Sequence, residues 1–175
     1  MNADALTRAR RVRMMLFDVD GVLTDGTLYI GEHGETMKGF NVRDGHGLKL
    51  LQDAGIEVGI VTSRQSAIVA RRAEELGIRR LHQGVPSKRA LVRDLLAKAG
   101  LEAAQGGFMG DDLLDLGAMA ECGFAATVPE SSEAVRERAH YVSRSAGGRG
   151  AVRELCEFLL AAQGKWDEAV RRHLT

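Results

Sequence analysis

Short apolar runs alternate with amphipathic segments along this chain. The runs that predict strands are 14–17, 56–61, 107–109, 124–126 and 141–142, and the last two are the weaker signals. Between them, apolar residues recur at the three- and four-residue spacing of one helix face over 68–76, 91–96 and, most clearly, 152–160. Such alternation predicts an α/β fold, with a mostly parallel sheet joined by right-handed crossovers and covered by helices on both faces.

One segment interrupts this alternation. Residues 26–42 hold two partly apolar stretches on either side of the loop Gly31-Glu32-His33-Gly34, which is typical of a β-hairpin placed between the first strand and the first helix. The tail after Gly164 is short and charged, and it predicts either a final helix turn or a mobile arm. We therefore expect one domain over 1–175, a three-layer Rossmann-like sheet with a small hairpin and no cap domain.

Composition narrows the class of protein. The chain has 175 residues, with 24 Lys plus Arg and 24 Asp plus Glu, so its formal net charge is zero. A neutral chain argues against bulk electrostatic binding to nucleic acid or to an anionic membrane. The longest strictly apolar run, 158–162, is too short to span a bilayer, and no apolar segment follows the N-terminal arginines as a secretory signal requires. Cys122 and Cys156 form no CxxC pair and indicate core residues in a reducing cytoplasm.

Candidate chemistry begins directly after the first strand, because ligands bind at the carboxyl ends of parallel strands. Asp18 and Asp20 lie there, and alternation in an extended chain places both on the same side. One carboxylate can act as a nucleophile that forms an aspartyl-phosphate, and the other as a general acid and base. Two carboxylates so close require a cation, and oxygen ligands suit Mg²⁺. The alternative for an isolated Asp-x-Asp is an acidic turn or helix cap.

Three later segments offer complementary groups. Asp111 and Asp112 follow another apolar run, where they can supply a metal carboxylate, cap a helix, or do both. Thr62 and Ser63 offer donors at an expected helix start, suited to a phosphate or to a plain N-cap. Lys88 lies near a predicted helix start, where a cation opposes the helix dipole. Pairing with a phosphate or with the Asp cluster would explain it; the alternative is a solvated surface lysine.

Taken together, these segments resemble the motifs of the haloacid dehalogenase superfamily of phosphotransferases. The motifs appear in order as Asp18-x-Asp20-Gly21-x-x-x-Asp25-Gly26, Thr62 after an apolar strand, Lys88, and Gly110-Asp111-Asp112-x-x-Asp115. Many members of the superfamily carry a cap domain, for which this chain has no room between its motifs. An uncapped site stays open unless a neighbouring subunit covers it, so the resemblance predicts a homo-oligomer.

The resemblance also implies roles for individual residues. Asp18 attacks phosphorus, Asp20 is the general acid and base, and Thr62 and Lys88 hold the phosphoryl oxygens. A Mg²⁺ ion is held by Asp18, by the backbone carbonyl of Asp20 and by Asp111. Asp112 and Asp115 support this arrangement. The chemistry agrees, since phosphoryl transfer requires positioning and neutralised charge.

Within the superfamily, residues 14–169 are similar to the family of 3-deoxy-D-manno-octulosonate 8-phosphate phosphatases. The matching stretches are 17–26, 40–45, 110–115 and 147–154. This resemblance implies hydrolysis of a phosphorylated sugar acid in lipopolysaccharide biosynthesis, in the cytoplasm, by a tetramer whose hairpins form a central barrel. In the family the C-terminal segment can reach a neighbour's site, and Gly147-Gly148-Arg149-Gly150 suits that role. The alternative for this stretch is a loop and cap before the last helix.

The family's substrate positions map onto a set of polar residues and their neighbours. They are Asp20, Asn41, Val42, Arg43, Asp44, Gly45, Lys49, Arg64, Arg72, Lys88 and Arg149. The arginine fork favours a sugar carboxylate, and we expect Arg64 and Arg72, two helical turns apart, on one helix face. For Lys49 and Arg72 the alternative is exposed helix charge. The chain departs from the family at Ser63, where glycine is common, and at Pro86; nothing assigns a role to His46.

Two other functions are compatible with the same resemblance. One is hydrolysis of a related nonulosonate 9-phosphate, such as a sialic-acid-like sugar. The other is a non-catalytic oligomerisation module, as found fused to sugar-nucleotide synthetases. The presence of Asp18, Asp20, Lys88 and Asp111 favours an enzyme.

Overall fold

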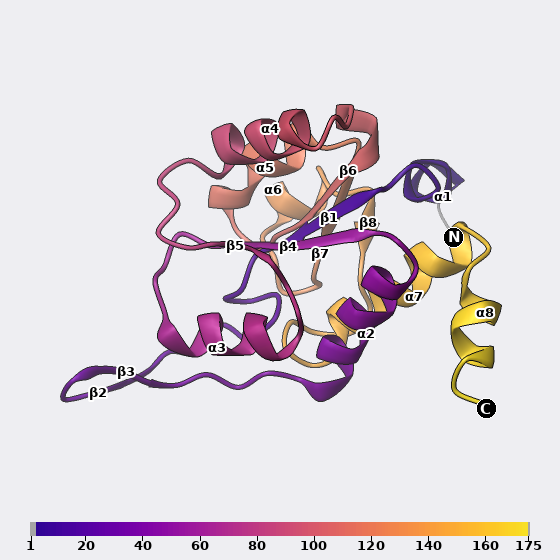
Figure 1. Cartoon of the computed structure of the whole chain (residues 1–175). Helices are drawn as coiled ribbons and strands as arrows, with labels where there is room; N and C mark the ends of the chain where they lie inside the picture. The colour runs from indigo at the N-terminus through magenta and orange to yellow at the C-terminus, as the bar shows by residue number, and fades with distance from the viewer. Residues whose placement is uncertain (1–2, 175) are drawn as a thin grey trace.

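A six-stranded parallel sheet forms the centre of the molecule (Figure 1). The computed structural model describes residues 3–174. The strands, in the order in which they lie side by side, are β5 (Arg80–His82), β4 (Glu57–Val61), β1 (Met14–Phe17), β6 (Gly106–Met109), β7 (Phe124–Thr127) and β8 (Tyr141–Val142). The parallel α/β sheet that the sequence predicts is confirmed.

Helices cover both faces of this sheet, as Figure 1 shows. One face packs against α1 (Ala3–Ala9), α2 (Val42–Asp53), α3 (Ala67–Glu75) and α7 (Ala151–Ala162). The other face packs against α4 (Lys88–Lys98), α5 (Leu116–Glu121) and α6 (Glu133–Arg136). Two short 3₁₀ helices, η1 (Ala103–Gln105) and η2 (Leu113–Asp115), and a final helix, α8 (Trp166–Arg171), complete the chain.

The central strand β1 shows why its sequence has no polar position. Met15 and Phe17 point into the core shared with α2 and α7, whereas Met14 and Leu16 point into the core shared with α4. All four side chains are buried, as expected for a strand that helices cover on both faces.

The predicted hairpin is present and extends away from the body of the molecule (Figure 1). Its strands, β2 (Tyr29–Gly31) and β3 (Gly34–Met37), are antiparallel. Val42, the predicted end of the hairpin segment, is already the first residue of α2. Several large apolar side chains on the hairpin are exposed, most of all Ile30 at 68%.

Some boundaries differ from the sequence prediction. The helix start expected at Thr62 and Ser63 is wrong: α3 begins at Ala67, and the hydroxyl of Ser66 caps it by accepting a hydrogen bond from the Val69 N–H at 3.3 Å. The edge strand β5 was not predicted, because its three residues are only half-buried and carry no apolar pattern. The tail forms α8, the first of its two alternatives.

Both cysteines are free and buried, as predicted. Among residues 3–174, no helix combines the length and the apolar character needed to cross a membrane.

Candidate active site

The candidate site lies at the carboxyl end of β1, where the direction of the sheet connections reverses. From β1 the chain passes to β4 and β5 on one side and then crosses to β6 on the other. In open α/β sheets, this switch point is where ligands bind. Asp18 follows β1 directly, and Asp111 lies two residues after the end of β6. The fold therefore brings together two segments that are far apart in the sequence.

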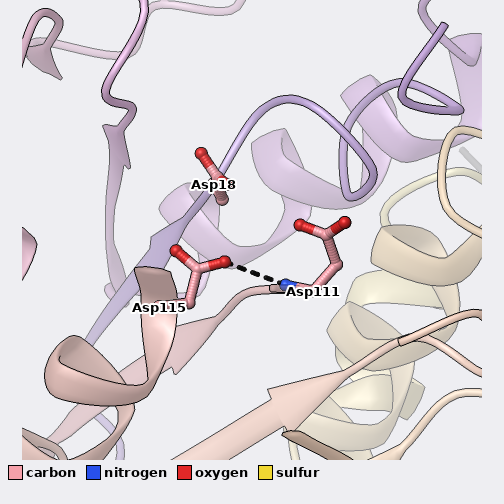
Figure 2. A group of neighbouring side chains, drawn as sticks. All are labelled: Asp18, Asp111 and Asp115. Carbon is pink, nitrogen blue, oxygen red and sulfur yellow. Dashed lines mark hydrogen bonds between the residues drawn. The ribbon is translucent and has the colours of Figure 1, made fainter. Parts of the chain in front are cut away.

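Asp18, Asp111 and Asp115 converge at this point (Figure 2). Each offers a carboxylate oxygen, and these oxygens lie within 4.8 Å of one another. Asp115 is fully buried, and its Oδ2 accepts hydrogen bonds from the N–H groups of Asp111 at 3.0 Å and Asp112 at 3.2 Å. Asp115 thus shapes the turn that presents the Asp111 carboxylate, in keeping with the supporting role implied by the resemblance.

Lys88 bridges two of these carboxylates. Its Nζ lies 2.9 Å from Asp18 Oδ2 and 2.6 Å from Asp115 Oδ1, and its side chain is only 4% exposed. Burial by itself lowers the pKa of the Lys88 ammonium, but the Asp18 and Asp115 carboxylates outweigh burial and raise it. Lys88 is therefore a fixed cation in the cluster, and the pairing that its sequence position suggested is present.

Asp111 has an oxygen without a partner. Its Oδ1 is buried and has no hydrogen bond. Burial, with the nearby Asp115 and Asp18 carboxylates, raises the pKa of Asp111 to about 7, and burial followed by the Asp115 charge raises the pKa of Asp18. Unpaired, crowded carboxylate oxygens are the ligands that a hard divalent cation prefers. Asp111 and Asp18 thus fit Mg²⁺, although Asp18 shares its Oδ2 with Lys88. Asp115 fits less well, because Lys88 takes up its Oδ1 and the backbone its Oδ2.

Gly21 has no room for a side chain. Its φ is +83°, a conformation that favours glycine, and a Cβ at this position would collide with the Asp111 carboxylate. A Cβ at Gly147 would in turn collide with the Gly21 carbonyl, and the Gly148 N–H donates to the Val22 carbonyl at 2.9 Å. The glycine-rich segment before α7 therefore packs against the Asp-x-Asp loop of its own chain.

Thr62 reaches the same edge from β4. It is buried, and its N–H donates to the His82 carbonyl at 2.9 Å, which joins the ends of β4 and β5. Its hydroxyl oxygen lies 3.4 Å from the Arg64 N–H, which donates to it. A side chain held at both its backbone and its hydroxyl is well placed to orient a ligand oxygen.

Asp20 meets two cations, one of which the sequence analysis missed. Lys38 Nζ pairs with Asp20 Oδ1 and lies 3.0 Å from Glu35 Oε1, while Arg64 Nε lies 3.7 Å from Asp20 Oδ2. The Lys38 side chain is 1% exposed. No periodic or motif signal marks Lys38, because it lies just after an exposed hairpin strand whose pattern predicts a solvated lysine.

The expected substrate segment at the start of α2 divides into two groups. Asn41 is the N-cap of α2, and its side chain accepts a hydrogen bond from the Arg43 N–H at 2.8 Å. Asp44 is buried, and its carboxylate accepts from the N–H groups of Gly150 at 3.2 Å and Arg153 at 2.7 Å. The Asp44 carboxylate therefore caps the start of α7.

The neighbouring positions differ in their exposure. The side chains of Val42, Arg43 and Lys49 are exposed. Gly45 is buried, and a Cβ there would collide with the Arg72 guanidinium. Exposed cations such as Arg43 and Lys49 are free to meet an anionic ligand, while Gly45 allows Arg72 to lie close to α2.

The other three candidate arginines, Arg64, Arg72 and Arg149, lie in different surroundings. Arg64 is in the loop before α3 and Arg72 is within α3, so the expectation that both share one helix face is wrong. The helix begins later than expected because Ser66 supplies its cap. Arg72 lies 5.9 Å from the Phe40 ring centroid and pairs with Glu75 at 3.3 Å. Arg149 pairs with Asp25 of the same chain at 3.2 Å.

The fold and the residues at this edge define a class of protein. A parallel sheet with Asp-x-Asp after its central strand, a threonine after the next strand, a buried lysine and an acidic turn is the arrangement of a haloacid dehalogenase-type phosphatase without a cap domain. Between β1 and α2 the described chain inserts only the hairpin of β2 and β3. Comparisons with known proteins identify the family within that class.

No family model matches the chain. Over 169 residues, it is 44% identical to the 3-deoxy-D-manno-octulosonate 8-phosphate phosphatase KdsC of Escherichia coli (strain K12), covering 97% of this chain and 90% of that protein. The Moraxella catarrhalis phosphatase, crystallised with magnesium, phosphate and KDO, has a TM-score of 0.94 and 39% identity, over 97% of this chain and 98% of that one. The Yersinia pestis phosphatase has a TM-score of 0.91 and 42% identity, over 94% and 89%. The chain belongs to the 3-deoxy-D-manno-octulosonate 8-phosphate phosphatase family.

Proposed function

We propose that this protein hydrolyses 3-deoxy-D-manno-octulosonate 8-phosphate to the free sugar acid and phosphate, with Mg²⁺, in lipopolysaccharide biosynthesis. The observation that carries the proposal is the cluster in which Lys88 bridges Asp18 and Asp115 beside the unpartnered oxygen of Asp111. Such a site suits a divalent cation and a phosphoryl group. The names of the relatives from Escherichia coli and Moraxella catarrhalis support this substrate.

The first step is phosphoryl transfer to Asp18. A carboxylate oxygen of Asp18 bonds to phosphorus as the bond between phosphorus and the sugar oxygen breaks. Lys88 and Thr62 hold the phosphoryl oxygens, and Asp20 gives a proton to the departing sugar oxygen. Asp18, Asp111 and, by the family resemblance, the backbone carbonyl of Asp20 would hold Mg²⁺, which would supply positive charge to neutralise the phosphoryl oxygens.

The second step releases phosphate. Asp20, now a carboxylate, takes a proton from a water molecule, whose oxygen attacks phosphorus and frees the Asp18 carboxylate. The position of Asp20 on the loop after β1, two residues beyond Asp18, suits both proton transfers. One residue thus serves as acid and then as base.

The sugar end of the substrate requires cations. Arg64 is well placed to meet it, since its side chain is 46% exposed and lies beside Asp20. An arginine fork binds a carboxylate through two parallel hydrogen bonds. The family resemblance adds a second set of contacts at Asn41, Val42, Arg43, Asp44, Gly45, Lys49, Arg72 and Arg149.

A substrate panel tests the proposal. Purified protein with Mg²⁺ is assayed for phosphate release from 3-deoxy-D-manno-octulosonate 8-phosphate, a nonulosonate 9-phosphate and simple hexose phosphates. We expect kcat/KM for the first compound to exceed that for the hexose phosphates, which lack a carboxylate, by about a hundredfold. It should also exceed kcat/KM for the nonulosonate ester. A preference for the nonulosonate ester would assign the alternative substrate, and no preference would contradict both.

We further propose that the chain is one phosphatase domain that works as a cytoplasmic homotetramer assembled through its hairpin. Leu28, Tyr29, Ile30 and Met37 expose apolar surface there. A two-stranded hairpin is marginal by itself, and burial against other subunits would stabilise it. Light scattering should report a tetramer for the natural chain and a smaller species for Ile30→Asp; an Ile30→Asp tetramer would place the interface elsewhere.

A further inference from the structure

The Lys38 ammonium lies between two carboxylates at the base of the hairpin, and neither catalytic step above uses it. It pairs with Asp20 Oδ1 and lies 3.0 Å from Glu35 Oε1. Its side chain is 1% exposed. An ammonium removed from water requires charged or polar partners, so Lys38 holds both carboxylates in place as they hold it.

Of the two cations beside the Asp20 carboxyl group, Lys38 makes the closer contact. Asp20 lies in a loop, where no regular hydrogen bonding restricts its carboxyl group, and this side chain is 22% exposed. The other nearby cation, Arg64 Nε, lies 3.7 Å from Oδ2, which is beyond hydrogen-bond distance, and its side chain is 46% exposed. Lys38 therefore engages Oδ1 and leaves Oδ2 as the oxygen for proton transfer.

A second set of contacts anchors Lys38 to the body of the protein. Glu35, on β3, also accepts a hydrogen bond from the hydroxyl of Ser66. Ser66 in turn caps α3. The contacts run without a break from α3 through Ser66, Glu35 and Lys38 to Asp20. They restrict a long, flexible lysine side chain to one position.

We propose that Lys38 is a positioning residue that orients the Asp20 carboxyl group towards the leaving oxygen of the substrate. This inference rests on the proposed function, since only that reaction uses Asp20 as an acid. In the step concerned, an Asp18 oxygen bonds to phosphorus, and the electron pair of the breaking bond stays on the sugar oxygen. That oxygen takes the proton from Asp20. Without Lys38, the Asp20 carboxyl rotates and the transfer loses its geometry.

The need for this proton depends on the leaving group. A sugar alkoxide is a strong base and requires protonation, whereas p-nitrophenolate is a stable anion and leaves without it. The ratio kcat/KM covers only the steps up to the phosphorylated Asp18, so later hydrolysis does not affect it. If Lys38 positions Asp20, its replacement should lower kcat/KM only for substrates with a basic leaving group. If Lys38 were merely structural, its replacement should lower kcat/KM equally for both kinds of substrate.

The test uses the full-length Lys38→Met protein with Mg²⁺. A general acid contributes about a hundredfold or more, and misplacing it should cost a large part of this. We therefore expect kcat/KM for the sugar-acid phosphate to fall at least about thirtyfold, and kcat/KM for p-nitrophenyl phosphate to fall less than about threefold. The inhibition constant of inorganic phosphate should change by less than about threefold, because Lys38 does not hold the phosphoryl group. Equal losses with both substrates, or no loss with the sugar phosphate, would overturn the proposal.

Controls separate this proposal from folding and from the identity of the substrate. Lys98→Met, at an exposed lysine on α4, should behave as the natural chain with both substrates. Lys38→Gln gives the same comparison if Lys38→Met does not fold. If the natural chain shows no preference for the sugar-acid phosphate, the proposed function fails. Benzyl phosphate, whose alkoxide is also basic, then replaces the sugar ester in the same Lys38 comparison and still decides it.

Discussion

The Lys88 ammonium lies 2.9 Å from the Asp18 carboxylate, so a positive charge already faces the predicted nucleophile. The Lys88 side chain is 4% exposed, and little water screens this charge. A lysine at the first position of a helix opposes the helix dipole, and the two carboxylates it contacts offset that unfavourable position. The same ammonium is available to a phosphoryl group that binds beside Asp18.

Lys88→Met should therefore impair both catalysis and stability. We expect kcat/KM to fall by about a hundredfold or more, because a fixed charge beside the phosphoryl group is lost. Breaking a buried ion pair should also lower the free energy of unfolding by about 3 kcal/mol. Steady-state kinetics and urea unfolding measure the two effects. The control is Arg89→Met, at the next position of α4, where the side chain is exposed. It should change kcat/KM and the free energy of unfolding only slightly.

Mg²⁺ should stabilise the fold through Asp111. An ion that binds only the folded state raises the free energy of unfolding by about 2.7 kcal/mol at a hundred times its Kd. We expect Mg²⁺ to raise the Tm of the natural chain and a chelator to reverse the rise and abolish activity. In Asp111→Asn, Mg²⁺ should raise the Tm much less than in the natural chain. In the control Asp112→Asn, Mg²⁺ should raise the Tm as in the natural chain, because asparagine can replace Asp112 as the cap of η2. If both variants lost the Mg²⁺-dependent rise in Tm equally, Asp111 would not be the ligand.

Gly21→Ala should damage the site, whereas Gly55→Ala should not. Both glycines have positive φ, +83° and +78°, so both substitutions introduce similar backbone strain of about 1 kcal/mol. Only at Gly21 would the new Cβ collide, because it meets the Asp111 carboxylate, while no atom lies within 4 Å of a Cβ at Gly55. Activity and the Mg²⁺ dependence of Tm should therefore fall in Gly21→Ala alone. Similar activity in the two variants would contradict this geometry.

Glu154 should make stability depend on pH. Burial raises its pKa, but hydrogen bonds from the N–H groups of Arg144 and Ser145 outweigh burial, and the pKa falls to about 2 from the usual 4.5. A carboxyl whose pKa is lowered by folding stabilises the protein fully above pH 4.5, and this contribution is lost as the pH falls towards 2. We expect Glu154→Gln to lower the free energy of unfolding by about 1–3 kcal/mol at pH 7.

Urea unfolding at pH 7, 4 and 3 measures this difference. The difference in the free energy of unfolding between Glu154→Gln and the natural chain should become smaller as the pH falls. Glu157→Gln, on the same helix and 39% exposed, is the control, and its smaller effect should follow the weak energy of a surface ion pair. If the difference in the free energy of unfolding between Glu154→Gln and the natural chain did not change with pH, the lowered pKa of Glu154 would be contradicted.

The apolar pattern predicted most of the sheet. The run at Met14–Phe17 has no polar position, and a strand covered on both faces buries every side chain, so pattern and structure agree. The edge strand β5 escaped prediction because its half-buried residues lack such a pattern. The start of α3 was misplaced because serine occurs at both Ser63 and Ser66, and either hydroxyl is chemically able to cap a helix.

By itself, the sequence determined the parallel α/β class, the hairpin, and the order of Asp18, Thr62, Lys88 and Asp111, because strand patterns and motif spacings are local properties of the chain. Only the tertiary structure decided which charges meet. Lys38 and Asp20 are 18 positions apart, and Asp44 caps a helix that begins more than 100 positions later. Neither pairing has a periodic signal, since it depends on how the hairpin base, α2 and α7 pack around the site. Packing removes water from these groups, and a buried charge then requires the partner that the fold brings to it.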